Sequence, residues 1–337
     1  MIIVLKAGSG DAEIQKVVAL IEKDGLTTHV SKGTERTLIG AIGDERKLNK
    51  NMIEEQECVE KVMPILKPYK LASREFHPEN TVIEIDDVRI GGDEITIMAG
   101  PCSLESEEQL MKIAHAVKDA GAQVLRASVY KPRTSPYDFQ GYGDDGLKIL
   151  KKAKQETGLL IETEVMDIRK VELAARYVDM VRIGARNTQN YDLLKEVGKI
   201  NKPVILKNGL ATTLNEFIMC AEYIMSNGNH NVILCNRGIR TYETETRFTL
   251  DHGVNPILKQ YTHLPLIVDP SHASGKRHIV KAHAKAAIAS GADGLLVEVH
   301  NYPENAICDG KQSLTVSGFK EMMGELKQIA SAVGRKM

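Results

Sequence analysis

One ten-residue stretch of the chain, residues 126–135, combines side chains that could bind an oxyanion. Its cations and hydroxyls are Arg126, Lys131, Arg133, Thr134 and Ser135. Arginine offers a planar fork of donors that matches a phosphate or a carboxylate, and lysine adds a point charge. Pro132 stiffens the loop, which lowers the entropy cost of holding its neighbours in place. The stretch alone could also be a solvated basic turn, so its role depends on what the rest of the chain places beside it.

Eight short apolar runs recur from residue 95 onward, and each ends at or just before a residue that could do chemistry. The runs are residues 95–99, 124–127, 159–164, 180–184, 204–207, 232–235, 264–268 and 295–299. Continuous apolar runs are typical of strands that are buried on both faces of a sheet. Helical patterns lie between the runs, for example at Leu110, Ile113, Ala114 and Val117.

This alternation predicts an α/β fold, a (β/α)8 barrel (TIM barrel) over residues 93–337. Eight strand–helix units in about 240 residues match the size and rhythm of such a barrel. The alternative is a doubly wound open sheet, but no glycine-rich dinucleotide fingerprint follows the first strand. Barrel enzymes place their chemistry at the C-terminal ends of the strands. We therefore expect the residues that follow the eight runs to meet at one end of the barrel.

The residues that follow the first, seventh and eighth runs could together bind a metal ion. Cys102 follows the first run, His272 follows the seventh, and Glu298 and Asp309 belong to the eighth run and its loop. Each alone has an ordinary explanation, such as a buried cysteine, a structural histidine or a helix cap. The first, seventh and eighth strands become neighbours when a barrel closes, so one ion could reach all four. Sulfur, nitrogen and oxygen ligands together suit a borderline divalent ion such as Mn, Fe, Co or Zn.

A second set of residues at the ends of the runs is cationic. It comprises Arg126, Lys131, Arg133, Arg186, Lys207 and Arg237. Cations around one mouth repel each other unless anions neutralise them. The set therefore predicts either a doubly anionic substrate or two phosphorylated substrates.

The first part of the chain, residues 1–66, is predicted to form a small ferredoxin-like βαββαβ domain. Its expected strands are residues 1–6, 28–32, 37–42 and 59–66, and its expected helices are residues 11–23 and 45–55. Such a module exposes one face of its sheet, which favours a regulatory role over a structural or dimerisation lobe. Residues 67–92 are a polar linker, within which residues 81–85 and 88–90 are expected to form a hairpin that caps one end of the barrel.

The totals of the chain exclude several classes of function. A net charge of −1 in 337 residues gives no bias toward nucleic acid or membrane, and the aromatic content of 4% argues against a base-stacking surface. The five cysteines form no CxxC pair, so they predict no disulfide framework. The N-terminus lacks a basic leader and a small-residue cleavage site, so we expect no secretory signal, and no apolar run is long enough to span a bilayer. We expect a soluble, cytoplasmic protein.

Taken together, the motifs resemble those of 3-deoxy-D-arabino-heptulosonate 7-phosphate (DAHP) synthase of the type I beta group. The matching motifs are Gly100-Pro101-Cys102-Ser103, Lys131-Pro132-Arg133-Thr134-Ser135, Gly184-Ala185-Arg186, Leu206-Lys207, Arg237-Gly238, Asp269-Pro270-Ser271-His272, Val297-Glu298-Val299-His300 and Asp309-Gly310. The resemblance implies the metal-dependent condensation of phosphoenolpyruvate with erythrose 4-phosphate, at the entry to the shikimate pathway. It also implies a homotetramer, and a regulatory lobe that binds tyrosine or phenylalanine.

The resemblance also implies a role for each group of residues. The metal ligands would be Cys102, His272, Glu298 and Asp309. Phosphoenolpyruvate would lie against Arg126, Lys131, Glu164, Arg186, Lys207 and Arg237, and Asp269 belongs to the same substrate-binding set. The phosphate of erythrose 4-phosphate would meet Arg133, Thr134 and Ser135. The catalytic residues would be Lys131, Glu164, Lys207 and His272, and the effector would meet His29 and Ser31.

Two departures from the family pattern and three alternatives remain. Ala127-Ser128 stands where members often have two glycines, and Asn236 stands where many have a glutamate. The nearest alternative is 3-deoxy-D-manno-octulosonate 8-phosphate synthase, which uses arabinose 5-phosphate. A Schiff-base aldolase that uses Lys207 would leave Cys102 and His272 without a role. A non-enzymatic sensor of aromatic amino acids would not need the metal quartet.

Overall fold

The computed structural model describes residues 1–33, 35–63 and 67–337. The chain divides into two compact units, residues 1–68 and 69–337. Each unit has its own hydrophobic core, which is consistent with two domains that could fold separately.

The N-terminal unit has the predicted ferredoxin-like order of strands and helices. Its elements are β1 (Ile2–Leu5), α1 (Asp11–Lys23), β2 (Thr27–Lys32), β3 (Thr37–Ile42), α2 (Lys50–Glu54) and β4 (Val59–Met63). The strands form an antiparallel sheet in the order β2-β3-β1-β4. Helix α1 buries Ile14, Val17, Val18 and Ile21 on one face, as the spacing predicted.

Two details of this unit differ from the expected boundaries. The predicted helix over residues 45–55 is a 3-10 turn (Glu45–Lys47) followed by α2. The side chain of Asn49 accepts a hydrogen bond from the amide of Met52 and so starts a new helix at that point. The end of the fourth predicted strand, residues 64–66, lies outside the described residues.

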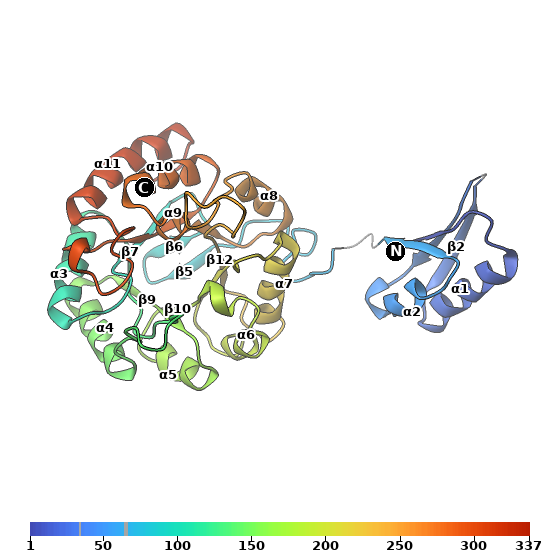
Figure 1. The fold of residues 1–337 in the computed structure, drawn as a ribbon, viewed down its shortest axis with the longest axis horizontal. Coiled ribbons are helices and arrows are strands. Elements are labelled where there is room, and N and C mark those ends of the chain that lie inside the picture. The colour runs from blue at the N-terminus through green and yellow to red at the C-terminus, as the bar shows by residue number, and fades with distance from the viewer. Residues whose placement is uncertain (34, 64–66) are drawn as a thin grey trace. The chain divides into compact units, whose positions relative to one another are not determined.

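The second unit is a closed barrel of eight parallel strands, as predicted (Figure 1). The strands are β7 (Thr96–Gly100), β8 (Val124–Arg126), β9 (Leu160–Val165), β10 (Met180–Ile183), β11 (Val204–Lys207), β12 (Val232–Asn236), β13 (Leu266–Val268) and β14 (Gly294–Glu298). Pairing between β14 and β7 closes the ring, so the first and last strands of the barrel are neighbours.

Helices surround the barrel and bury their apolar stripes against it. They are α3 (Glu107–Asp119), α4 (Asp144–Thr157), α5 (Val171–Ala175), α6 (Tyr191–Val197), α7 (Leu214–Met225), α8 (Val254–Tyr261), α10 (Arg277–Ala289) and α11 (Val316–Ala332). A short additional helix, α9 (Pro270–Ser274), follows β13 directly. Among the described residues, no helix has the length and apolar character needed to cross a membrane.

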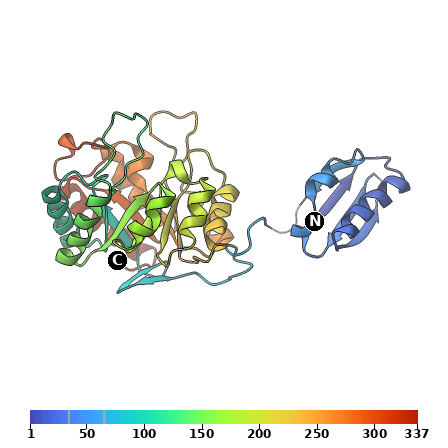
Figure 2. The ribbon, with the colours of Figure 1, turned by 90° about the horizontal axis from the view of Figure 1, so that it is seen from below.

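A hairpin of β5 (Ile83–Ile85) and β6 (Val88–Ile90) covers one end of the barrel. Ile83 and Ile90 are buried in the same apolar cluster as Met98, Val124 and Leu160 from the barrel strands. Figure 2 shows the hairpin at the end opposite the long loops that follow the strands. The end formed by the C-terminal ends of the strands therefore stays open.

Candidate active site

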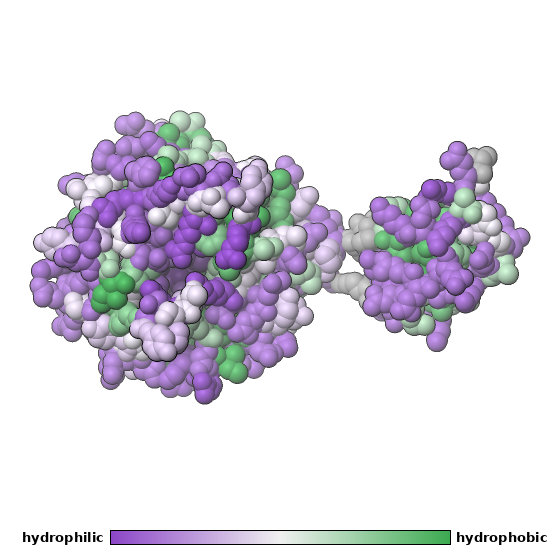
Figure 3. All heavy atoms as spheres, viewed as in Figure 1, coloured by the Kyte–Doolittle hydropathy of each residue, from purple (hydrophilic) through white to green (hydrophobic). Residues whose placement is uncertain are grey.

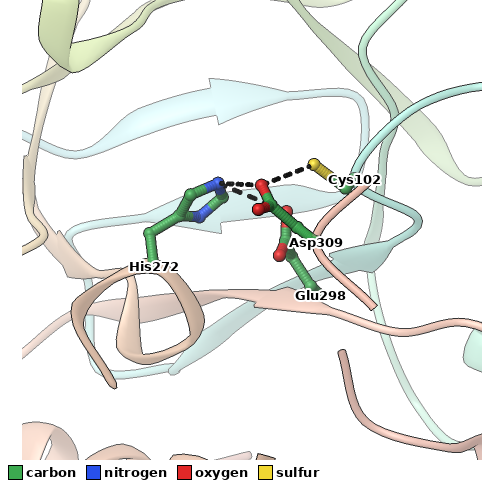
Figure 4. Close-up of side chains that lie close together, drawn as sticks. All are labelled: Cys102, His272, Glu298 and Asp309. Atoms are coloured by element: carbon green, nitrogen blue, oxygen red, sulfur yellow. Dashed lines mark hydrogen bonds and ion pairs between the residues drawn. The ribbon is translucent and has the colours of Figure 1, made fainter. Parts of the chain in front are cut away.

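Four potential metal ligands meet at the open end of the barrel (Figure 4). Cys102 follows β7, His272 lies on α9, Glu298 is the last residue of β14, and Asp309 lies in the loop after β14. One ligand atom from each lies within 4.8 Å of the others. This convergence follows from the closure of the barrel, because β13, β14 and β7 are consecutive neighbours in it.

Local structure aims His272 at the other three side chains. The Asp269 carboxylate caps α9 by accepting a hydrogen bond from the His272 amide at 2.9 Å, and Pro270 occupies the first helical turn. The second oxygen of Asp269 lies 2.7 Å from Nδ1 of His272. Since Nδ1 faces Asp269, Nε2 is left to face the remaining members of the quartet.

Asp309 adopts a left-handed backbone conformation, with φ at 54°. Aspartate tolerates this region better than most residues. The next residue must be glycine, since a Cβ atom on Gly310 would lie 2.1 Å from the carbonyl oxygen of Pro303. This tight turn brings the Asp309 carboxylate toward Cys102 and His272.

The separations within the quartet suit one bound ion. Nε2 of His272 lies 3.3 Å from Oε1 of Glu298 and 3.7 Å from Oδ2 of Asp309, and Sγ of Cys102 lies 3.2 Å from that same Oδ2. Ligands around a tetrahedral ion with bonds of 2.0–2.3 Å are separated by about 3.3–3.8 Å. The donor set and its dimensions therefore fit a divalent ion of the borderline class.

The charges in the quartet also suit a cation. Burial alone would raise the pKa of Asp309, but His272 and Arg247 lower it below its usual value. Burial lowers the pKa of His272, which favours the neutral imidazole that a metal requires. A hydrogen bond with Cys308 and burial raise the pKa of the Cys102 thiol, so a bound cation would have to ionise it.

A hollow of about 180 Å³ lies beside the quartet, and cations are the largest group among the residues that line it. The cations that line it are Lys131, Arg133, Arg182, Arg186, Lys207, Arg237 and Arg247. Pro132, Thr134, Glu164, His272 and Asp309 complete much of the wall. Figure 3, which looks onto this end, shows hydrophilic residues around the mouth of the barrel. Such a surface is suited to a small molecule that carries several negative charges.

Arg237 is held in a way that leaves it available to a bound anion. Its guanidinium group stacks on the ring of Phe248 at 3.5 Å, and its Nη1 is buried without a hydrogen-bond partner among the described residues. Burial lowers the pKa of Arg237 to about 10. A buried donor of this kind is stabilised when a ligand oxygen accepts its hydrogen bond.

Three predicted substrate residues do not line the hollow. Arg126 is completely buried, with Nη1 donating to Oε1 of Glu298 at 2.6 Å. Asp269 is also buried and forms an ion pair with Lys207. Ser135 is partly buried, and its hydroxyl accepts a hydrogen bond from the Tyr137 backbone amide. The other predicted substrate residues of the barrel are all in the wall.

The predicted regulatory residues belong to the N-terminal unit. His29 and Ser31 alternate along β2 and are both exposed, whereas Val30 between them packs on the core of that unit. Their partners in the sheet are Gly40 and Leu38, and Leu38 is also exposed. They therefore lie on the face of the sheet that its own core leaves uncovered.

The two departures from the family pattern are accommodated by hydrogen bonds. Ser128 accepts one from Nη2 of Arg182 at 2.8 Å, so its hydroxyl helps to hold an arginine of the wall. Asn236 donates to Oδ1 of Asn255 at 3.0 Å and accepts from the Gly238 amide at 3.1 Å. Its amide therefore fixes the loop that begins with Arg237.

The sequence reasoning missed Arg182, Arg247 and Gln312. Arg182 donates to Oε2 of Glu162 and to Oε2 of Glu164, both at 2.9 Å, inside the barrel. Arginine and glutamate in the middle of apolar runs were a signal for this network, because charged residues are buried only when paired. Arg247 and Gln312 lie in loops without a periodic pattern, which gave no comparable signal.

A (β/α)8 barrel with four potential metal ligands beside a hollow that seven cations line is typical of an enzyme that acts on small anionic substrates. Residues 75–333 match the model of the DAHP synthetase I family, and residues 1–67 match the DAHP synthase ferredoxin-like domain. The chain belongs to the DAHP synthetase I family. Its activity is that of a DAHP synthase, a transferase of the shikimate pathway.

The chain is similar to relatives with two different names. The chain is 51% identical over 337 residues to the phospho-2-dehydro-3-deoxyheptonate aldolase of Thermotoga maritima, with all of both chains covered. The crystal structure of a Thermotoga maritima protein of that name superposes with a TM-score of 0.96 over 99% of this chain and 98% of that one. A 2-dehydro-3-deoxyphosphooctonate aldolase of Geotalea uraniireducens is 33% identical over 74% of this chain and 98% of its own.

Proposed function

We propose that this protein condenses phosphoenolpyruvate with erythrose 4-phosphate and water, and that a divalent metal ion is required. The products are 3-deoxy-D-arabino-heptulosonate 7-phosphate and inorganic phosphate. The observation that carries the proposal is the quartet of Cys102, His272, Glu298 and Asp309 beside a hollow walled by seven cations. Two phosphorylated substrates would neutralise such a wall.

The cations of the wall divide between the two substrates. Arg186, Lys207 and Arg237 line the hollow and would bind the phosphate and carboxylate of phosphoenolpyruvate. Arg133 and Thr134 also line it and would bind the phosphate of erythrose 4-phosphate. Arg133 is held by Asp138, whose Oδ2 lies 3.2 Å from its Nη2. An exposed pair of this kind can open to admit a phosphate at little cost.

In the reaction, C3 of phosphoenolpyruvate attacks the aldehyde carbon, and the aldehyde oxygen becomes a hydroxyl. Water adds at C2, and phosphate leaves when the C2–O bond breaks. When bound by the quartet, a divalent ion supplies Lewis acidity toward the aldehyde oxygen. The residues of the chain hold the substrates, exclude water from the carbon that attacks, and move the protons.

Lys131 is the candidate acid for the new hydroxyl. Its Nζ lies 3.0 Å from Sγ of Cys102 and therefore beside the proposed metal position. Burial would lower the pKa of Lys131, but the charges of Cys102 and its other neighbours raise it above its usual value. The side chain therefore carries a proton that it can donate at this point.

Glu164 is the candidate base for the attacking water. Burial would raise the pKa of Glu164, but Arg182, Lys131 and Lys207 keep it below its usual value. The carboxylate is therefore ionised and can accept a proton. One of its oxygens accepts a hydrogen bond from Arg182, which fixes its orientation toward the hollow.

The substrate assignment is tested by measuring consumption of phosphoenolpyruvate with either erythrose 4-phosphate or arabinose 5-phosphate. The second sugar is the substrate expected if the protein were instead a 3-deoxy-D-manno-octulosonate 8-phosphate synthase. We expect turnover with the four-carbon sugar, loss of activity in a chelator, and recovery with Mn²⁺. Preference for arabinose 5-phosphate, or activity that a chelator leaves intact, would contradict the proposal.

We also propose that tyrosine or phenylalanine inhibits the enzyme by binding at β2 of the N-terminal unit, and that the enzyme is a homotetramer. The exposed His29 and Ser31 could bind the polar groups of an amino acid, and the exposed Leu38 and Ile42 on β3 could contact its ring. Isothermal titration with both amino acids tests binding, and His29→Ala is expected to abolish it. Light scattering gives the mass of the assembly.

A further inference from the structure

Two side chains outside the quartet, Gln312 and Arg247, bind the carboxylates of its acidic members. Gln312 is buried, and its Nε2 donates to Oε2 of Glu298 at 2.6 Å. Nη1 of Arg247 donates to Oδ1 of Asp309 at 3.2 Å and to Oε1 of Gln312 at 3.1 Å. One chain of hydrogen bonds therefore connects Asp309, Arg247, Gln312 and Glu298.

These hydrogen bonds distinguish the two oxygens of each carboxylate. In Glu298, Oε1 lies near Nε2 of His272 and also accepts a hydrogen bond from Nη1 of Arg126 at 2.6 Å, and Oε2 is bound by Gln312. In Asp309, Oδ2 lies near both His272 and Cys102, and Oδ1 is bound by Arg247. Each carboxylate thus turns one oxygen toward the proposed metal position and gives the other to this chain of donors.

Both donors are themselves fixed by backbone contacts. The backbone N–H of Gln312 donates to the carbonyl oxygen of Asp309 at 3.2 Å, in the turn that carries this potential ligand. The amide of Arg247 donates to the carbonyl oxygen of Ser274 at 3.1 Å, on the helix that carries His272. A Cβ atom on Gly275 would lie only 2.7 Å from Cβ of Arg247, so glycine allows the two segments to meet.

We propose that Gln312 and Arg247 are positioning residues of the metal quartet. By occupying the outer oxygens, they hold both carboxylates so that each presents a single oxygen to the ion. This inference rests on the metal site proposed above. If it is right, the affinity for metal depends on two residues that do not bind the metal. Through Arg247, the loop after β12 contacts the quartet directly.

The chemistry of the two donors supports this role. An amide hydrogen bond orients a carboxylate without adding a charge that would repel a cation, and Gln312 is the donor in the most buried position. Arg247 adds a positive charge, but its contact is with the oxygen farther from the quartet. Removal of such partners of metal ligands typically weakens metal binding by about 10–100-fold.

The test is titration of the metal-free full-length protein with Co²⁺, followed by the visible absorption of the bound ion and its thiolate charge-transfer band. Gln312→Met removes the hydrogen bonds but keeps about the length of the side chain. Arg247→Met removes the guanidinium donors and keeps only the apolar stem of the side chain. Lys311→Ala, at the exposed neighbour of Gln312, is the matched control. We expect both methionine variants to bind Co²⁺ about 10–100-fold more weakly, and the control to bind like the wild type.

Further readouts separate positioning from other roles. Turnover of Gln312→Met should recover at saturating metal, because Gln312 does not line the hollow. Arg247→Lys, which keeps a donor, should restore part of the metal affinity that Arg247→Met loses. Arg247 is partly exposed, so its variants decide the question if Gln312→Met fails to fold. If the folded variants bound Co²⁺ with wild-type affinity and an unchanged spectrum, the positioning role would be wrong, but the proposed metal site would stand. Failure of the wild type to bind Co²⁺ would instead remove the proposed metal site.

Discussion

The Nε2 atom of His272 lies 3.3 Å from Oε1 of Glu298, although the two residues come from successive strand–loop units of the barrel. The Asp269 side chain, which caps α9, fixes the first residue, and the end of β14 fixes the second. Because β14 also pairs with β7, the same end of the barrel receives Cys102. The site is therefore a product of barrel closure rather than of any local motif.

Loss of the sulfur ligand should abolish metal-dependent turnover. In Cys102→Ala the quartet keeps only three donors. Loss of a residue that only supports a metal ligand weakens metal binding by up to about 100-fold. Loss of a ligand itself should therefore lower the affinity for Co²⁺ or Mn²⁺ by more than this. Metal titration and initial rates measure both effects. Cys220→Ala, at a buried cysteine on α7, is the control and should retain both. Near-normal metal affinity in Cys102→Ala would exclude this residue as a ligand.

Lys131→Met should lower kcat more than it changes KM. The variant keeps the volume of the side chain but cannot donate a proton, and a positioned acid typically contributes about 10²–10⁴-fold. Steady-state kinetics at saturating metal separates the two constants. Lys148→Met, at an exposed lysine on α4, is the control. If Lys131→Met retained nearly normal kcat, another group would have to supply the proton.

The sequence predicted the architecture and the composition of the quartet because both follow from the order of the apolar runs. Eight strands in a closed ring require their C-terminal ends to meet, so Cys102 and Asp309 could be placed together without coordinates. The pairing of the charged residues inside the strands could not be predicted in this way. Arg182 donates to both Glu162 and Glu164, and such pairing depends on side-chain direction, which apolar periodicity does not specify.

Loops limited the prediction further. Arg247 reaches Asp309 only because its backbone is bound to Ser274 and because Gly275 has no side chain at the point of contact. No repeat or spacing in the sequence carries this information. Burial is equally hard to infer from the sequence, since Arg126 at the end of β8 is completely buried and donates to Glu298. Its contact with a substrate stays a prediction.

Arg133→Ala should weaken the binding of erythrose 4-phosphate selectively. Arg133 lines the hollow, and its ion-pair partner is the exposed Asp138. The main effect of the substitution should therefore be the loss of a contact with the substrate phosphate. We expect KM for erythrose 4-phosphate to rise by about 10-fold or more, since a charge-assisted hydrogen bond contributes roughly 1.5–3 kcal/mol. KM for phosphoenolpyruvate should change little. Arg169→Ala, at an exposed arginine, is the control; equal effects on both substrates would contradict the assignment.

The stability of the barrel should decrease on acidification because of a histidine pair near α8 and α10. Nε2 of His252 lies 3.1 Å from Nδ1 of His283. Burial lowers the pKa of both below 6.5, and their mutual repulsion adds to the effect at His252, although Asp251 opposes it. As the pH falls through about 6.5, these histidines take up protons in the unfolded chain before they do so in the folded protein. The unfolded state then binds more protons than the folded state, so the free energy of unfolding decreases in that range.

Thermal unfolding at several pH values between about 5 and 8 measures this loss. The double variant His252→Asn/His283→Asn should lose less stability on acidification than the wild type. His278→Asn, at an exposed histidine, is the control and should behave like the wild type. An identical dependence on pH in the double variant and the wild type would show that the pair does not contribute.

Removal of the N-terminal unit should leave an active barrel that aromatic amino acids no longer inhibit. Residues 69–337 have their own core, and the quartet and the hollow lie entirely within them. We therefore expect the shortened protein to fold and to turn over substrates. Inhibition by tyrosine or phenylalanine that persisted in it would place the effector on the barrel and refute the role of His29 and Ser31.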